Sequence, residues 1–271
     1  MATHRIGIFD SGIGGLTVAS AIRKTLPSES FVYFGDTAHL PYGDKSAELI
    51  QGYALRITEF LLHEMHCKAI VIACNTASAA AYEVLRDRYK GSVPVINVID
   101  PMVERIIADD NIHHVGIIAT KTTVNSGVYQ EKLSRRKPSL KYAAVATPLL
   151  ATMIEEGFYN SNVSHAVLEK YLNDKRLKSI DALVLACTHY PLIKKEIASF
   201  LGPQVQVLDS AEVVADKLRR ILEKEGLTAT SKEAEDIFYV SDFTESFAQS
   251  TSVFFPEKVE LRKSNLWESK R

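Results

Sequence analysis

Residues 69–76 read AIVIACNT, and residues 182–189 read ALVLACTH. Each segment is a continuous apolar run that ends in a cysteine followed by two polar residues. An apolar run without alternation is typical of a strand buried on both faces of a parallel sheet. The two cysteines, Cys74 and Cys187, lie 113 residues apart, about the length of one domain. The repeated pattern therefore predicts two similar lobes, each presenting one thiol at the end of a buried strand.

Strand-like segments alternate with helical patterns along the whole chain. Strands are expected at residues 4–9, 31–35, 69–73, 93–99, 115–119, 141–146, 182–186, 205–208, 236–240 and 258–261. Helices are expected at residues 16–26, 46–66, 123–136, 149–156, 163–175, 192–201 and 211–225, after Cys74, from Asp100 and after residue 240, and residues 37–45 are expected to form a loop. This alternation predicts an α/β fold whose mainly parallel sheets are flanked by helices.

We expect two pseudo-symmetric lobes with the active site in the cleft between them. The first lobe is predicted to comprise residues 1–97 and 211–271, and the second residues 98–210. Ligands of such sheets bind beyond the carboxyl ends of the strands, where the candidate residues lie.

Composition argues against several classes of protein. The 271 residues include 32 Lys and Arg against 33 Asp and Glu, so the net charge is −1. This balance argues against partners such as nucleic acid or a membrane surface. No apolar run approaches the roughly 18 residues that span a bilayer, and the N-terminus lacks a signal-peptide pattern, so we expect a cytoplasmic protein. The three cysteines argue against a disulfide framework.

Cys74 and Cys187 each precede an expected helix. Unpaired amides and the helix dipole at such a position lower the pKa of a thiol from about 8.5. A single buried cysteine is often inert, and Cys67, which lacks this context, is expected in the core. Two cysteines that each follow an apolar strand and precede an expected helix favour a functional role for both thiols. Thiols on opposite walls of a cleft can remove a proton from one face of a carbon and return one to the other face.

Other polar residues follow the expected strands. Asp10 can hydrogen-bond a thiol or an ammonium group, or cap a helix. His189 can supply a proton near Cys187 or lie on the surface, and Glu155 alone would be a solvated acid. Neutral hydrogen-bonding groups at strand ends or helix starts could together hold carboxylates, although each also fits a helix cap. They are Asn75, Thr76, Thr120, Thr123 and Thr188.

The glycine-rich segment at residues 10–15, DSGIGG, allows a dinucleotide-binding alternative. Gly12 and Gly14 fit the G-x-G pattern, and Asp36 could imitate the ribose-binding acid. Thr17, however, stands where the third glycine belongs. The pattern therefore weighs against nicotinamide binding.

A zinc site is the other cofactor alternative. His63, His66 and Cys67 cluster, but they do not form H-E-x-x-H, and the chain has no Cys-x-x-Cys pair. We expect neither a metal nor a cofactor.

Four segments resemble glutamate racemases. They are IGIFDSGIGGLTV (6–18), FGDTAHLPYGDKS (34–46), IVIACNTASA (70–79) and LVLACTHYPL (183–192). The similarity runs in order over most of residues 6–210. The last 60 or so residues are less distinctive.

The resemblance implies a cofactor-independent racemase that converts L-glutamate to D-glutamate for bacterial peptidoglycan. It implies two pseudo-symmetric α/β lobes with the substrate between them, and a homodimer. Cys74 and Cys187 would be the two acid/base groups. Asp10 would assist Cys74, while His189 and Glu155 would assist Cys187.

A larger set of residues would hold the substrate. By the resemblance these are Asp10, Ser11, Pro41, Tyr42, Gly43, Asn75, Thr76, Thr120, Thr123, Thr188 and His189. Two positions depart from the family pattern: Ala119 replaces a glycine, and Thr152 stands where proline is usual. Both departures bear on local loop shape. Glutamate specificity comes from the resemblance, since the residues alone indicate a carbon-acid isomerase. An aspartate racemase and a non-catalytic protein that binds a small acid remain alternatives.

Overall fold

The computed structural model describes residues 4–255 and 257–268. The strands are β1 (Ile6–Asp10), β2 (Phe31–Gly35), β3 (Ala69–Ile72), β4 (Val95–Asn97), β5 (His114–Ala119), β6 (Lys141–Ala146), β7 (Ala182–Ala186), β8 (Gln206–Asp209), β9 (Ile237–Val240) and β10 (Leu261–Lys263). The α-helices are α1 (Leu16–Thr25), α2 (Ala47–Glu59), α3 (Asn75–Arg88), α4 (Ile99–Ile107), α5 (Lys121–Asn125), α6 (Val128–Arg136), α7 (Pro148–Glu155), α8 (Asn162–Leu172), α9 (Lys194–Leu201), α10 (Ala211–Glu225) and α11 (Glu245–Phe254).

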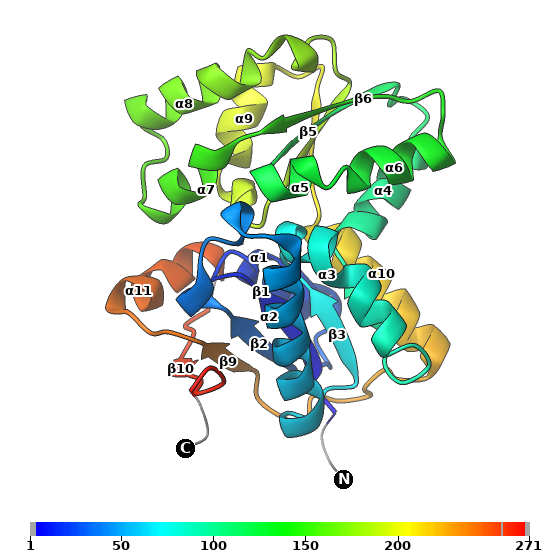
Figure 1. The fold of residues 1–271 in the computed structure, drawn as a ribbon, viewed down its shortest axis with the longest axis vertical. Helices are drawn as coiled ribbons and strands as arrows, with labels where there is room; N and C mark the ends of the chain where they lie inside the picture. Colours follow the sequence, from blue (N-terminus) through cyan, green and yellow to red (C-terminus); the bar gives the residue numbers. More distant parts are fainter. Residues whose placement is uncertain (1–3, 256, 269–271) are drawn as a thin grey trace.

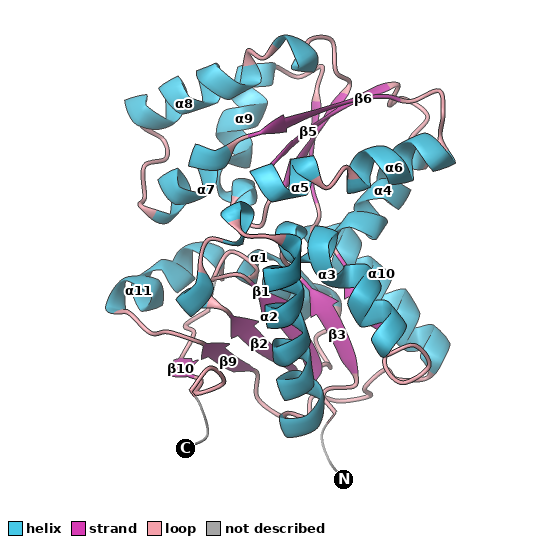
Figure 2. Ribbon diagram, viewed as in Figure 1, coloured by secondary structure: helices cyan, strands magenta, loops and turns pink. Residues whose placement is uncertain are grey.

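The strands form two parallel sheets, one in each lobe (Figure 1). The first has the order β10-β9-β2-β1-β3-β4, and the second has the order β6-β5-β7-β8. Helices lie against both sheets (Figure 2), which confirms the predicted α/β class. Strands of the first sheet come from residues 6–97 and 237–263, and those of the second from residues 114–209. The lobe boundaries at 97/98 and 210/211 stay predictions.

Alternate residues along each strand of the first sheet enter different cores. On one face Ile8 and Val71 join the apolar side chains of α1, α4 and α10, in a core that continues into the second lobe. On the other face Phe9 and Ile72 pack against α2 and α3. Burial on both faces explains why these strands read as unbroken apolar runs. Among the described residues, every helix is too short or too polar to cross a membrane.

Several predicted boundaries were wrong. The strand expected at residues 258–261 lies instead at Leu261–Lys263. The helix expected to run to residue 66 ends as α2 at Glu59 and continues as a π-helical turn. The helix expected at 123–136 is two helices, because Gly127 between α5 and α6 adopts a positive φ of 66°. The expected loop at 37–45 contains two 3₁₀ turns, Thr37–His39 and Tyr42–Asp44.

Candidate active site

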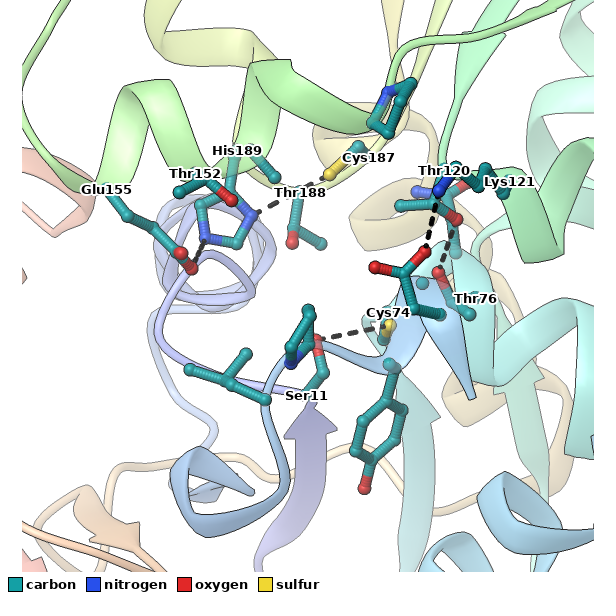
Figure 3. Close-up of a pocket in the computed structure, with 18 residues that line it drawn as sticks. Ser11, Cys74, Thr76, Thr120, Lys121, Thr152, Glu155, Cys187, Thr188 and His189 are labelled. Atoms are coloured by element: carbon teal, nitrogen blue, oxygen red, sulfur yellow. Dashed lines mark hydrogen bonds and ion pairs between the residues drawn. The ribbon is translucent and has the colours of Figure 1, made fainter. Parts of the chain in front are cut away.

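A cavity of about 80 Å³ lies between the lobes and is drawn in Figure 3. Its volume is several times the roughly 15 Å³ that one water molecule needs, so it can admit a small molecule. Most of the predicted site residues line it. They are Ser11, Pro41, Tyr42, Gly43, Cys74, Asn75, Thr76, Thr120, Glu155, Cys187, Thr188 and His189. Asp10 and Thr123 were also predicted, but both are buried behind the cavity wall.

The two cysteines enter the cavity from different lobes (Figure 3). Cys74 directly precedes α3 of the first lobe, and Cys187 follows β7 of the second. Their relative exposures are 5% and 8%. Both sulfurs therefore border one enclosed space.

Cys74 caps helix α3 with its own sulfur, which accepts a hydrogen bond from the amide of Ala77 at 3.4 Å. The expected caps, Asn75 and Thr76, are instead the first residues of the helix. The thiol donates to Oγ of Ser11 at 3.6 Å. Burial, followed by the negative charge of Asp10, raises the pKa of Cys74 to about 12. The prediction of a lowered pKa was wrong because desolvation outweighs the amide at the helix start.

Cys187 has different surroundings. A 3₁₀ turn, Tyr190–Ile193, follows it, and α9 begins only at Lys194, so the expected α-helix start is absent here. Its Sγ lies 3.7 Å from Nδ1 of His189. Nε2 of the same ring lies 2.8 Å from Oε1 of Glu155. Cysteine, histidine and glutamate thus form a chain along one wall of the cavity.

His189 is buried, with 3% exposure. Burial alone would lower the pKa of its imidazole, but the hydrogen bonds to Cys187 and Glu155 outweigh burial and raise the pKa well above its ordinary value. The protonated ring places a positive charge beside the sulfur of Cys187.

Asp10 organises the glycine-rich turn. Its Oδ2 accepts hydrogen bonds from the amides of Gly12 at 3.1 Å and Gly15 at 3.0 Å, and its Oδ1 accepts one from the Thr188 hydroxyl at 3.4 Å. Burial raises the pKa of Asp10, against the opposing effects of His189 and the backbone amides. These two amides are occupied by the carboxylate rather than presented to a ligand phosphate.

Two glycines lie where the lobes come close together. Gly14 belongs to the glycine-rich turn, and Gly43 belongs to the 3₁₀ turn Tyr42–Asp44. A Cβ at Gly14 would lie 2.7 Å from the His189 ring and from the hydroxyl of Thr188. A Cβ at Gly43 would lie 2.9 Å from the Cβ of Thr120. Both contacts join residues of the first lobe to residues of the second. The glycine-rich turn therefore resembles a dinucleotide loop in sequence only.

Hydroxyl groups join the lobes on another side of the cavity. Oγ1 of Thr120 lies 2.9 Å from that of Thr76 and 3.0 Å from that of Thr123. Beside this cluster, Oδ1 of Asn75 accepts a hydrogen bond from the hydroxyl of Tyr129 at 3.2 Å. Nδ2 of Asn75 is buried and has no hydrogen-bond partner among the described residues. Asn75, one of the residues that line the cavity, thus carries a buried amide donor without a partner among the described residues.

A buried carboxylate supports the loop that carries Pro41, Tyr42 and Gly43. Asp36 is fully buried and accepts hydrogen bonds from the hydroxyl of Tyr42 at 2.6 Å and from Nε1 of Trp267 at 2.9 Å. Ser241 donates to it at 2.8 Å, and Nδ1 of His39 lies 2.9 Å away. Because Asp36 is engaged inside the protein, it does not present a free acid to a ribose.

Sequence reasoning missed Trp267 and several lining residues. The latter are Leu40, Asp44, Lys121, Pro148, Ala151 and Thr152, the last of which we had noted only as a departure. Lys121 and Asp44 face each other at 3.3 Å. Leu40, Asp44 and Lys121 each adjoin a predicted residue in the chain, which was the available signal for these three. In the described ranges, no group of three or more His, Cys, Asp or Glu side chains could hold a metal ion.

Comparison with known proteins gives a consistent result. Residues 16–218 match the family described as Asp/Glu/Hydantoin racemase. The chain is 42% identical to the glutamate racemase of Syntrophus aciditrophicus over 91% of this chain and 90% of that protein. It is also 42% identical to the glutamate racemase of Geobacter metallireducens, over 96% and 95%. A crystal structure of the Francisella tularensis glutamate racemase in complex with D-glutamate is similar at a TM-score of 0.91 and 37% identity, covering 98% and 99% of the chains.

Proposed function

The chain belongs to the Asp/Glu/hydantoin racemase family and, within it, to the glutamate racemases; from this premise we propose that it interconverts L- and D-glutamate by proton transfer between two thiols. The observation that carries the mechanism is that Cys74 and Cys187 border one cavity from different lobes. A carbon held between them would present opposite faces to the two sulfurs. This arrangement is what inversion at Cα requires.

In the proposed reaction, the thiolate of one cysteine takes the proton from Cα, and the C–H electron pair stays on the substrate as a carbanion delocalised into its carboxylate. The thiol of the other cysteine then gives its proton to the opposite face of Cα. The first sulfur ends as a thiol and the second as a thiolate, so protons and charge balance without a redox partner. Catalysis in the reverse direction exchanges the roles of the two cysteines.

The surroundings of the two cysteines differ, and we use this difference to assign one as the acid and the other as the base. With a pKa of about 12, Cys74 begins as the thiol and therefore as the acid. We assign Cys187 as the base, because protonated His189 lies 3.7 Å from its sulfur and can stabilise negative charge there. Glu155 holds the histidine ring in place and supports its positive charge.

The cavity also offers donors for a carboxylate. Nδ2 of Asn75 is buried without a partner in the described part of the chain, and Thr76, which carries a hydroxyl, also lines the cavity. A carboxylate bound by such donors can accept the charge that develops when Cα loses its proton. Asp10 lies behind this wall, where we propose that it holds the glycine turn and Thr188 in place.

The experiment is incubation of L-glutamate in D₂O with the wild type, Cys74→Ser and Cys187→Ser. We expect deuterium at Cα and D-glutamate from the wild type and loss of racemisation in both variants. Folded wild-type protein that produces neither deuterated nor D-glutamate would refute the proposal. Parallel incubation with L-aspartate tests the aspartate alternative. Tight binding of glutamate without exchange would indicate the non-catalytic protein.

We further propose that the D-glutamate supplies bacterial peptidoglycan synthesis. A cytoplasmic location and a homodimer also stay predictions. Fractionation of cells and size-exclusion chromatography with light scattering would test them directly.

A further inference from the structure

Asn75 lies in an unusual position for an amide side chain. It opens helix α3, is 2% exposed and lines the cavity. A buried amide normally has partners for both its oxygen and its nitrogen, since an unmade hydrogen bond costs about 1–3 kcal/mol. Here the oxygen is satisfied by Tyr129, and Nδ2 has no partner within the described residues. The side chain is therefore held for a ligand that accepts a hydrogen bond.

Tyr129 reaches Asn75 from the other lobe. It lies in the first turn of α6, and Gly127, with its positive φ, separates this helix from α5. The tyrosine is 4% exposed, and burial raises the pKa of its hydroxyl above the ordinary value. The hydroxyl therefore remains protonated and can donate its proton at working pH. Its acceptor is Oδ1 of Asn75, at 3.2 Å.

This hydrogen bond decides which end of the amide meets the substrate. In an amide rotated by 180°, the oxygen would be the end left without a partner, and it would repel a carboxylate. A phenol that donates to the oxygen favours the orientation in which the N–H groups are the end left to bind a ligand. The consequence for an anionic ligand is attraction instead of repulsion.

We propose that Tyr129 is a positioning residue that fixes the side-chain amide of Asn75 so that its N–H groups bind the substrate carboxylate. The identity of the substrate in this inference rests on the proposed function. Its geometry rests on the contacts of Asn75 and Tyr129 described above. Because the two residues belong to different lobes, the amide is correctly oriented only when the lobes are together. Tyr129 does not itself line the active-site cavity; it borders a second cavity, of about 330 Å³, in the second lobe.

A double-mutant cycle tests the proposal. Tyr129→Phe keeps the ring and removes the hydroxyl. We expect kcat/KM for L-glutamate to fall about five- to tenfold, as for the loss of one hydrogen bond. In an Asn75→Ala background, the same substitution should change kcat/KM by less than about twofold, because its effect acts through Asn75. Equal losses in both backgrounds, or no loss in either, would overturn the inference.

Tyr142→Phe is the matched control, since Tyr142 borders the same second cavity but lies on strand β6. It should leave kcat/KM unchanged. A second measurement does not depend on turnover. It follows the ¹H–¹⁵N NMR signals of the Asn75 side-chain amide, which are assigned by their loss in Asn75→Ala. We expect Tyr129→Phe to shift or broaden them and Tyr142→Phe to leave them alone. Unaltered signals in Tyr129→Phe would contradict this inference, whether or not the wild type has racemase activity. A wild type without racemase activity would refute the proposed function, which is a separate outcome.

Discussion

Replacement of His189 by glutamine removes a positive charge from beside Cys187 while keeping a polar side chain of similar length. The imidazole lies 3.7 Å from the sulfur and 2.8 Å from Glu155. At 3.7 Å and an effective dielectric constant of about 20, two unit charges attract by roughly 4 kcal/mol. Burial of the imidazolium opposes part of this energy, so we expect a net loss of about 2–4 kcal/mol. That loss corresponds to a decrease of roughly 30- to 1000-fold in kcat/KM.

The assay combines racemisation rates with alkylation. Iodoacetamide labelling of free enzyme at neutral pH, read by mass spectrometry at Cys187, should slow in His189→Gln because the sulfur loses the neighbouring positive charge that favours its reactive form. Glu155→Gln keeps the ring and removes only its anchor, so we expect a smaller loss, of about tenfold. His165→Gln changes an exposed histidine on α8 and serves as the control for substitution itself. A kcat/KM within about threefold of wild type, with unchanged labelling of Cys187, would refute the reasoning.

The same substitution has a predicted pH signature in stability. The pKa of folded His189 is raised above that of the unfolded chain, so its protonation stabilises the fold fully below about pH 6.5. The contribution is lost as the pH rises through the raised value. The difference in melting temperature between wild type and His189→Gln should therefore shrink from pH 6 towards alkaline pH. A difference that grows with pH would contradict the assignment of a protonated ring.

Three further predictions follow from contacts around the cavity. With a pKa of about 12, Cys74 should be thiolate in only about one molecule in 10⁴ at pH 8, so iodoacetamide should label it far more slowly than free cysteine, and a comparable rate would contradict that pKa. Gly14→Ala should destabilise the protein by about 1–3 kcal/mol in urea unfolding, because the new methyl group would meet the second lobe. Gly52→Ala, in open space on α2, should instead stabilise it by about 0.5–1 kcal/mol, and equal effects would refute the steric argument. Trp267→Phe removes one hydrogen-bond donor to Asp36, the carboxylate that also accepts a hydrogen bond from Tyr42. We expect KM for glutamate to rise a few-fold with kcat nearly unchanged. An unchanged KM would contradict the idea that Asp36 supports the loop of Tyr42.

Buried strands were the most predictable part of the fold. Strands β2, β6 and β7 match their predicted residues. For β2 and β7 the reason is that side chains buried on both faces leave an unbroken apolar run, whereas burial alternates along β6. Strand β10 lies at the sheet edge and reads LRK, so no apolar pattern marked it. The break between α5 and α6 lies at Gly127, which adopts a positive φ, and a π-helical turn follows α2; a helical periodicity reports neither feature.

Parts of the site were predictable where a reactive residue follows a recognisable strand in the sequence. The repeated strand–cysteine pattern located both thiols, yet the dipole argument gave the wrong sign for the pKa of Cys74, because it ignored how completely the fold buries the sulfur. Trp267 could not be foreseen, since its partner Asp36 is 231 residues away in sequence. Tyr129 was hidden for the same reason, because a hydrogen bond between lobes leaves no local pattern.

The two cysteine motifs are alike in sequence but differ in their surroundings, and this difference has a kinetic consequence. Enantiomers have equal free energies, so the ratio of kcat to KM must be the same for L- and D-glutamate. In the proposed mechanism Cys187, beside protonated His189, is the base and Cys74 is the acid, so only one enantiomer meets the two groups already in the roles that it needs. The other must bind the minor form, in which Cys74 is the thiolate. Its KM is thereby increased, and its kcat must increase in the same proportion. In the proposed mechanism, two similar lobes therefore supply the opposed thiols, and we expect the His189–Glu155 pair on one wall to make the two directions of the reaction unequal in kcat and in KM.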